Sequence, residues 1–343
     1  MDNFIREDSD EYSSELTNEL ITSEEEKTKN ISLVNETKKL QRVASTIGVM
    51  LILLVSGLPA LRSYLFNLID VFFHLRYGSI QLSVYISSYV CLLASYPLII
   101  YLSTLLYEYK PLAILKVKPK NASYNYLMGV FCLSISALLI IFTSFFNEDN
   151  EYGYYLKNIV SIFDDKKYFV IMAIVLCVIA PFLEEYLFRG CFIKMLMPFG
   201  EVFAVVFSAL SFGLLHSNYN QKIAGFILGF FLGIYYIKSQ SIYPCVIIHG
   251  LFNFLSLGSA IINVHGGIKF LIFIGAVAFM MIFAFSIDSP FRISTYENNH
   301  LPLKTKFIKL YLNGFIIVII VYAIVIRAID FLIYLRSYRY YKY

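Results

Sequence analysis

The sequence predicts an all-α, polytopic transmembrane helical bundle with about eight or nine spans. The 343-residue chain is 58% hydrophobic and only 15% charged, whereas about 25% of the residues in soluble globular domains are charged. Apolar runs long enough to cross a bilayer core recur along the chain. Because these runs are continuous and separated by polar breaks, they favour helices over the alternating pattern of an outer-membrane barrel.

The predicted spans fill the chain from residue 43 to residue 335. In order, they are Val43–Leu61, Leu82–Tyr107, Leu127–Phe146, Phe169–Leu183, Val202–Leu215, Ile223–Ile237, Ile242–Ile262, Phe270–Ile287 and Leu312–Leu335. Whether the last run belongs to the same bundle decides between eight and nine. The parity of that count sets the side of the basic C-terminal tail, residues 336–343, so this side stays open.

The first 42 residues differ in kind from the rest of the chain. They hold 11 of the 24 acidic residues but only 6 of the 28 basic ones. Few apolar positions recur there with any period, which predicts a flexible, solvated extension. The extension lacks a basic start followed by a short apolar core, so no cleavable signal peptide is predicted. The chain therefore divides into an acidic extension (1–42), a membrane domain (43–335) and the tail.

Basic residues beside the spans predict the orientation of the chain. Lys38, Lys39 and Arg42 precede the first span and favour a cytoplasmic N-terminus. Beyond the extension, 22 basic residues (28 − 6) face 13 acidic ones (24 − 11), a surplus suited to anionic membrane lipid. The bias toward Lys, Asn, Ile and Tyr favours a bacterial cell membrane. No basic surface interleaved with aromatic residues indicates nucleic-acid binding.

Residues 180–192 read APFLEEYLFRGCF and place three charged side chains inside an apolar run. An ionisable group at mid-bilayer costs about 3 kcal/mol or more, so this cluster predicts a functional site. Glu185 and Arg189 are four residues apart and share a helix face, which predicts an ion pair. Glu184 points about 100° away and is left free for chemistry. The alternative is that the three charged side chains form a polar cluster between helices with only a structural role.

The next span ends in FGLLH, residues 212–216. His216 lies about 16 residues beyond the Pro198–Gly200 break, and Glu184 lies about 14 residues, or roughly 20 Å, before it. An antiparallel hairpin would therefore bring Glu184 and His216 to a similar membrane depth. The alternative is an interfacial histidine with no role in a site.

A third polar motif, HGLFN, occupies residues 249–253 within the seventh span. The spacing of four puts His249 and Asn253 on one helix face. Asn carries two donors and no charge, which suits the binding of an oxyanion. The alternative is a hydrogen-bonding pair between helices. His249 lies only about eight residues past the turn at 239–241, so a shared depth with Glu184 requires a tilted or shallow helix.

Gly225, Gly229 and Gly233 form two overlapping G-x-x-x-G units between these motifs. Small residues at this spacing let helices approach closely, so a packing role is predicted for them.

A carboxylate, two histidines and an asparagine that converge in a bundle form a hydrolytic set. Glu184 would take a proton from water, and His216 would orient that water. His249 and Asn253 would stabilise the tetrahedral intermediate. The same side chains allow a second arrangement, in which Glu184, His216 and His249 ligate Zn²⁺. The sequence does not separate the two. It contains no H-E-x-x-H helix, no G-x-S-G, no G-x-G-D and no Walker A loop.

In order and in approximate spacing, EEYLFR, FGLLH and HGLFN resemble the three motifs of the CAAX-processing and bacteriocin-processing (CPBP) proteases, which include the type II CAAX endopeptidases. The resemblance covers roughly residues 165–260, which would be the catalytic core. It implies an intramembrane endopeptidase that cuts prenylated proteins near the C-terminus or cuts small peptides. By motif position it implies that Glu184 is the general base, assisted by His216. His249 and Asn253 would form the oxyanion hole, with Glu185 and Arg189 as support.

The resemblance leaves the cofactor, the substrate and the retention of activity open. The family has been described both as metal-dependent and as glutamate-dependent, so Zn²⁺ stays an alternative. A peptide or lipidated-protein substrate is expected. The rival hypothesis is a catalytically silent membrane protein of the same fold, acting as an immunity factor or a scaffold. A transporter is disfavoured because the sequence shows no internal repeat.

Overall fold

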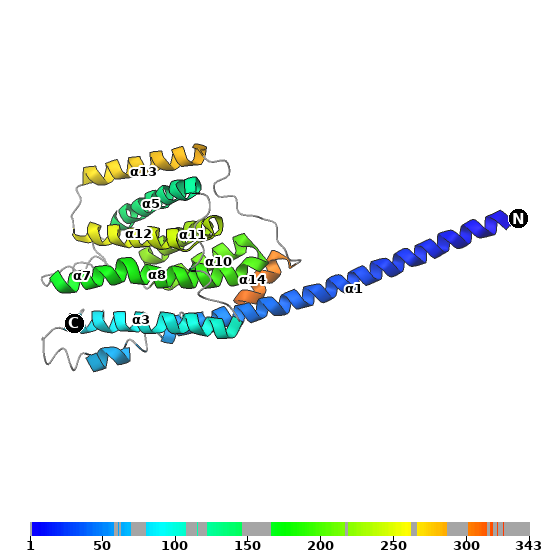
Figure 1. Cartoon of the computed structure of the whole chain (residues 1–343), viewed down its shortest axis with the longest axis horizontal. Coiled ribbons are helices and arrows are strands. Elements are labelled where there is room, and N and C mark those ends of the chain that lie inside the picture. Colours follow the sequence, from blue (N-terminus) through cyan, green and yellow to red (C-terminus); the bar gives the residue numbers. More distant parts are fainter. Residues whose placement is uncertain are drawn as a thin grey trace, which may run out of the picture.

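The computed structural model is helical in all of the regular structure that it describes (Figure 1). It describes residues 2–57, 61, 63–69, 80–107, 115, 122–145, 166–216, 219–261, 266–286, 301–313, 316, 317, 321 and 325. No strand occurs in these ranges, which confirms the predicted all-α class.

The helices overlap each predicted apolar run from the first to the eighth, and one more helix, α14, lies just before the ninth run. They are α1 (Asp2–Ile52) with η1 (Leu53–Gly57), α3 (Ile80–Tyr107), α5 (Ala122–Phe145), a composite helix over residues 166–199, α10 (Glu201–Leu214), α11 (Tyr219–Ser239), α12 (Tyr243–Ile261), α13 (Gly266–Ser286) and α14 (Leu303–Tyr311). The ninth run and the basic tail lie almost wholly outside the described residues.

Two described helices are long and apolar enough to cross a membrane. They are Phe169–Phe199 and Asn220–Ser239, and further apolar helices of 10–17 residues accompany them. Large apolar side chains are also exposed on the outer faces of the bundle, among them Ile171, Ile247 and Leu271. Exposed apolar surface of this extent fits a lipid environment. The membrane character of the chain is thus supported, while the count of eight or nine spans stays a prediction.

The N-terminal segment differs from the flexible extension that its composition predicts. Residues 2–52 form the single helix α1, which runs beyond the bundle at its N-terminal end (Figure 1). No proline interrupts this segment. Leu40, Val43, Ala44 and Ile47 are fully buried at helical spacing, so packing on the bundle fixes the later turns. From residue 24 to residue 31 the side chains are exposed, as expected for a solvated segment.

The composite helix that carries EEYLFR switches from α-helical to π-helical hydrogen bonding at two places. α7 (Lys166–Ile174) leads into the π-helix η3 (Val175–Ile179), and α8 (Ala180–Glu185) leads into a second π-helix, η4 (Tyr186–Ile193). Short α9 (Lys194–Leu196) and the 3₁₀ turn η5 (Met197–Phe199) end it. π segments are rare inside helices and frequent at functional sites.

The turn after the composite helix is made by Gly200. Its φ of 127° lies in a region that side chains rarely adopt. This confirms the predicted break at Pro198–Gly200, after which α10 returns alongside the composite helix.

The composite helix occupies the middle of the bundle. It contacts α3 through α8 and η4, α10 and α11 through η4, and α12 through η3 and α8. α5 packs against α11, α12 and α13, so α13 lies on the outside (Figure 1). Polar side chains on α8 and η4 therefore face neighbours from several helices.

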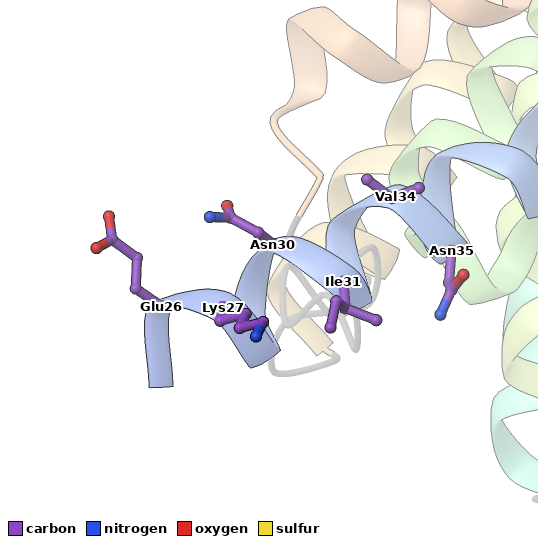
Figure 2. A pocket seen from close by; sticks show the side chains of 6 residues that line it. All are labelled: Glu26, Lys27, Asn30, Ile31, Val34 and Asn35. Atoms are coloured by element: carbon purple, nitrogen blue, oxygen red, sulfur yellow. The ribbon is translucent and has the colours of Figure 1, made fainter. Parts of the chain in front are cut away.

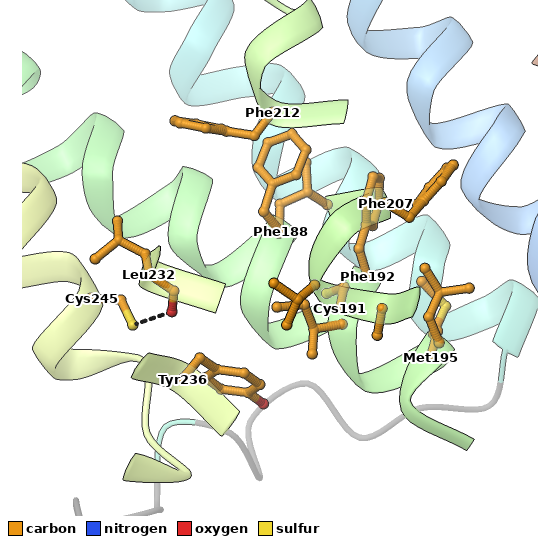
Figure 3. Packing of buried hydrophobic residues seen from close by; sticks show 14 of the residues in the cluster. Phe188, Cys191, Phe192, Met195, Phe207, Phe212, Leu232, Tyr236 and Cys245 are labelled. Carbon is orange, nitrogen blue, oxygen red and sulfur yellow. Dashed lines mark hydrogen bonds between the residues drawn. The ribbon is translucent and has the colours of Figure 1, made fainter. Parts of the chain in front are cut away.

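Aromatic and sulfur side chains fill the space around η4 (Figure 3). Phe188 meets Phe192 and Phe212 edge to face, each pair at a ring-centroid distance of 5.2 Å. Cys245 Sγ lies 3.4 Å from the Leu232 carbonyl oxygen, to which it donates. This packing fixes η4 firmly between α10, α11 and α12.

Glycines let α10 and α11 approach at backbone contact. A Cβ added to Gly213 would lie 2.7 Å from the Lys222 carbonyl oxygen, and one added to Gly233 would lie 3.0 Å from Val205. On the facing helix, a Cβ at Gly225 would lie 3.4 Å from the Gly213 Cα. The packing role predicted for the glycine series is thereby confirmed.

Candidate active site

Arg189 and Glu185 form the ion pair that their spacing predicts. Arg189 Nε lies 2.9 Å from Glu185 Oε2, and both side chains are 0% exposed. The direction of this contact departs from that of a hydrogen bond, so it is electrostatic. Arg189 Nη2 donates to the Gly229 carbonyl oxygen at 3.2 Å. A buried pair is destabilised strongly when one partner is removed, so the two charges depend on each other.

His249 lies between the two glutamates. Its Nδ1 is 2.9 Å from Glu185 Oε1, and its Nε2 is 3.7 Å from Glu184 Oε2. Because the carboxylate of Glu185 accepts, Nδ1 carries the proton, and Nε2 is protonated only in the imidazolium form. Glu185 therefore orients the imidazole toward Glu184, in the way that a carboxylate orients histidine in a hydrolytic triad.

The two neighbouring carboxylates differ in access. Glu185 is 0% exposed, whereas the side chain of Glu184 is 19% exposed. Only Glu184 can therefore meet a bound molecule directly. Tyr96, buried on α3, interacts electrostatically with Glu184.

Asn253 lies one helical turn after His249 and is anchored to the composite helix. Its Nδ2 donates to the Leu176 carbonyl oxygen at 2.8 Å. An amide nitrogen has two N–H groups, so one remains for another acceptor. Between the two residues, Gly250 meets η3 at backbone contact, because a Cβ there would lie 2.3 Å from the Cys177 carbonyl oxygen.

His216 follows the last turn of α10. Its Nδ1 lies 3.1 Å from the Phe212 carbonyl oxygen. A carbonyl only accepts, so Nδ1 is the donor and Nε2 faces away as the available nitrogen. The ring packs at 3.3 Å from the position of a Cβ on Gly225, so glycine leaves the room that the imidazole occupies.

Phe212 joins the charged residues to both histidines. Its ring centroid is 5.1 Å from that of His216 and 5.5 Å from that of His249, and both contacts are edge to face. Arg189 Cζ lies 5.0 Å from the same ring centroid, within cation–π range. The structure thus places His216 and His249 against the same aromatic ring.

The predicted zinc arrangement does not fit the side chains as they lie. Within the part of the chain that the structure describes, no three His, Cys, Asp or Glu side chains are grouped so that they could hold a metal ion. His249 directs one nitrogen to Glu185, and His216 directs one to a backbone carbonyl. A zinc site on Glu184, His216 and His249 would need these side chains to turn.

A surface hollow of about 480 Å³ lies away from these residues (Figure 2). It is lined only by residues of α1, namely Glu26, Lys27, Asn30, Ile31, Val34 and Asn35. None of them belongs to the candidate site.

Sequence reasoning missed several residues that build this site. Phe212 packs against both histidines, Tyr96 interacts electrostatically with Glu184, and Gly250 and Pro181 shape the backbone beside the site. Gly250 and Phe212 lie inside the quoted motifs, so their positions were available in the sequence although their roles were not.

The family comparison covers the segment that carries these residues. Residues 166–255 match the model of a family described as Rce1-like, type II CAAX prenyl endopeptidase Rce1-like. The match covers 90 residues (255 − 166 + 1) of 343 and includes all three motifs. It confirms the resemblance to the CPBP proteases. No curated protein and no solved structure matches the chain.

Proposed function

We propose that this chain, with its Rce1-like segment at residues 166–255, is an intramembrane endopeptidase that hydrolyses a peptide bond with water activated by Glu184. One observation carries the proposal. His249 is fixed by buried Glu185 and directs its other nitrogen toward Glu184, the only one of the two carboxylates with access. The carboxylate of Glu184 and the imidazole of His249 therefore form a pair of polar groups at the edge of an apolar interior.

The roles of the two groups follow from their positions. Glu184 takes a proton from water as that water attacks the peptide carbonyl, and it then delivers the proton to the leaving amine. His249 in the imidazolium form donates from Nε2 to the developing oxyanion while Nδ1 stays on Glu185. The second N–H of Asn253 donates to the same oxygen. His216, with Nε2 available, orients the water.

The substrate class follows from the family and from the apolar surroundings. A lipidated C-terminal segment would share the bilayer with the exposed apolar faces of the bundle. The proposed location is a cell membrane, with the N-terminus on the cytoplasmic side. Bacteriocin processing and an immunity role rest on the wider family alone.

Glu184→Gln tests the general base. The variant keeps the size of the side chain but lacks the basic oxygen, so cleavage of a prenylated CAAX-type peptide by the purified full-length chain should fall at least about 100-fold. Glu25→Gln, at an exposed position on α1 away from the site, is the matched control and should cleave normally. Membrane abundance and melting temperature should be unchanged in both. Wild-type cleavage by the Glu184→Gln variant would refute the assignment.

Two further measurements separate the alternatives. If the enzyme uses zinc instead, the purified active protein should contain about one metal per chain and His249→Ala should lose it. If the chain is a silent scaffold, wild type and Glu184→Gln should be equally inactive on every peptide. They should then also support the same cellular phenotype.

A further inference from the structure

The π-helix η3 leaves a backbone carbonyl without a partner in its own helix. Ala180 N–H donates to the Val175 carbonyl oxygen, which is pairing from residue i+5 to residue i. In the same register, the Leu176 carbonyl would need the N–H of residue 181. That residue is proline, which has no N–H.

A side chain of α12 takes the missing place. Asn253 Nδ2 donates to the Leu176 carbonyl oxygen at 2.8 Å. The following carbonyl, of Cys177, lies against Gly250 of the same helix. Two adjacent carbonyls of η3 therefore face the HGLFN motif, and the missing N–H of Pro181 accounts for the first of them.

We infer that Pro181 is a positioning residue for Asn253. By withholding its N–H, it leaves the Leu176 carbonyl as a fixed acceptor, and that acceptor holds one N–H of the Asn253 amide. Because an amide is planar, fixing one N–H also fixes the direction of the other. Asn253 then keeps a single orientation beside His249.

A second side chain contact shows the same construction elsewhere in the composite helix. Ser208 Oγ on α10 donates to the carbonyl oxygen of Phe188, inside η4, at 2.9 Å. Each π segment thus has a carbonyl that a neighbouring helix satisfies. The Ser208 contact does not depend on Pro181, so it provides an internal control.

A double-mutant cycle tests the hydrogen bond without any substrate. Asn253→Ala should lower the melting temperature of the full-length protein, because it leaves the part-buried Leu176 carbonyl without its donor. In a Pro181→Ala background, the new N–H can supply the bond, so less than half of that loss should remain. Ser208→Ala should cost the same in both backgrounds. An equal loss from Asn253→Ala in both backgrounds would overturn the inference.

Asn253→Asp covers the case in which Pro181→Ala does not fold. An ionised carboxylate has no donor and faces a carbonyl oxygen, so this variant should melt at least as low as Asn253→Ala. A melting temperature equal to that of the wild type would contradict the inference.

The catalytic consequence rests on the proposed function. With a prenylated CAAX-type peptide, Asn253→Ala should lower kcat about 100-fold, the usual cost of one oxyanion donor. Pro181→Ala should lower kcat by part of that factor with KM within twofold, and adding it to Asn253→Ala should cause no further loss. Unchanged kcat in Pro181→Ala would remove the positioning role. If the wild type cleaves nothing, the proposed function fails while the melting cycle still decides the hydrogen bond.

Discussion

Replacing Gly250 by alanine should push α12 away from the composite helix. The new Cβ would lie 2.3 Å from the Cys177 carbonyl oxygen, whereas ordinary contact begins at 3.4 Å, so about 1.1 Å (3.4 − 2.3) must be gained. The obstacle is the backbone of another helix, which cannot rotate away as a side chain can. Overpacking of this kind costs about 1–3 kcal/mol, and alanine in a helix returns up to about 1 kcal/mol relative to glycine. We expect a net loss of about 1–2 kcal/mol.

Gly250→Ala should lower the catalysed rate more than it lowers the stability of the fold. Gly250 directly follows His249, so a shift of about 1 Å moves the imidazole relative to both glutamates. Misplacement on that scale can lower a catalysed rate about 100-fold. The variant should therefore fold, melt a few degrees lower and cleave poorly.

A thiol-reactive dye suits the melting assay. The chain contains no tryptophan, and four of its five free cysteines are buried, so unfolding exposes new thiols. Gly258→Ala on the same helix is the matched control, because nothing lies within 4 Å of its added Cβ. It should melt at or above the wild-type temperature. If Gly250→Ala melted as high as Gly258→Ala and cleaved normally, the backbone contact between α12 and η3 would be refuted.

Two other substitutions probe the supports of the site. Arg189→Met should lower stability by about 3–5 kcal/mol, because it removes the cation beside the buried Glu185 carboxylate and leaves only the contact with His249. A melting temperature within one degree of wild type, roughly 1 kcal/mol or less, would contradict the buried ion pair. Gly213→Ala should also destabilise the chain, by about 1–3 kcal/mol, since its Cβ would lie 2.7 Å from the Lys222 carbonyl oxygen. Thermal melting of this variant at the wild-type temperature would show that α10 and α11 are not held at backbone contact.

Local spacing predicted the part of the site that lies on one helix. The four-residue interval between Glu185 and Arg189 gives an ion pair because neighbours at that interval share a face. The same rule separated Glu184 from Glu185, and their exposures differ accordingly. Contacts within one helix can therefore be predicted directly from the spacing of residues in the sequence.

Contacts between helices could not be predicted in the same way. The bond from His249 to Glu185 joins α12 to α8, and its existence depends on how far the two helices slide and rotate against each other. Counting residues from turns suggested that His249 would lie too shallow. The register changes at η3 and η4 alter these relations, and they depend on Pro181 and on carbonyl partners from α10 and α12.

Composition described the first 42 residues poorly for a similar reason. Their many charges predict solvation, which the exposed turns before residue 32 show. Leu40 nevertheless belongs to the buried face that continues into the bundle. A boundary drawn by charge content therefore falls inside a helix, because packing of the later turns on the bundle supports a helix that continues across it.

Phe212 has a consequence for proton movement. A benzene ring carries no exchangeable hydrogen, and this one packs edge to face against the imidazoles of both His216 and His249. The shared contact therefore gives the two histidines no route for a proton through the ring itself. Any proton that both handle must travel through water or through a reacting molecule.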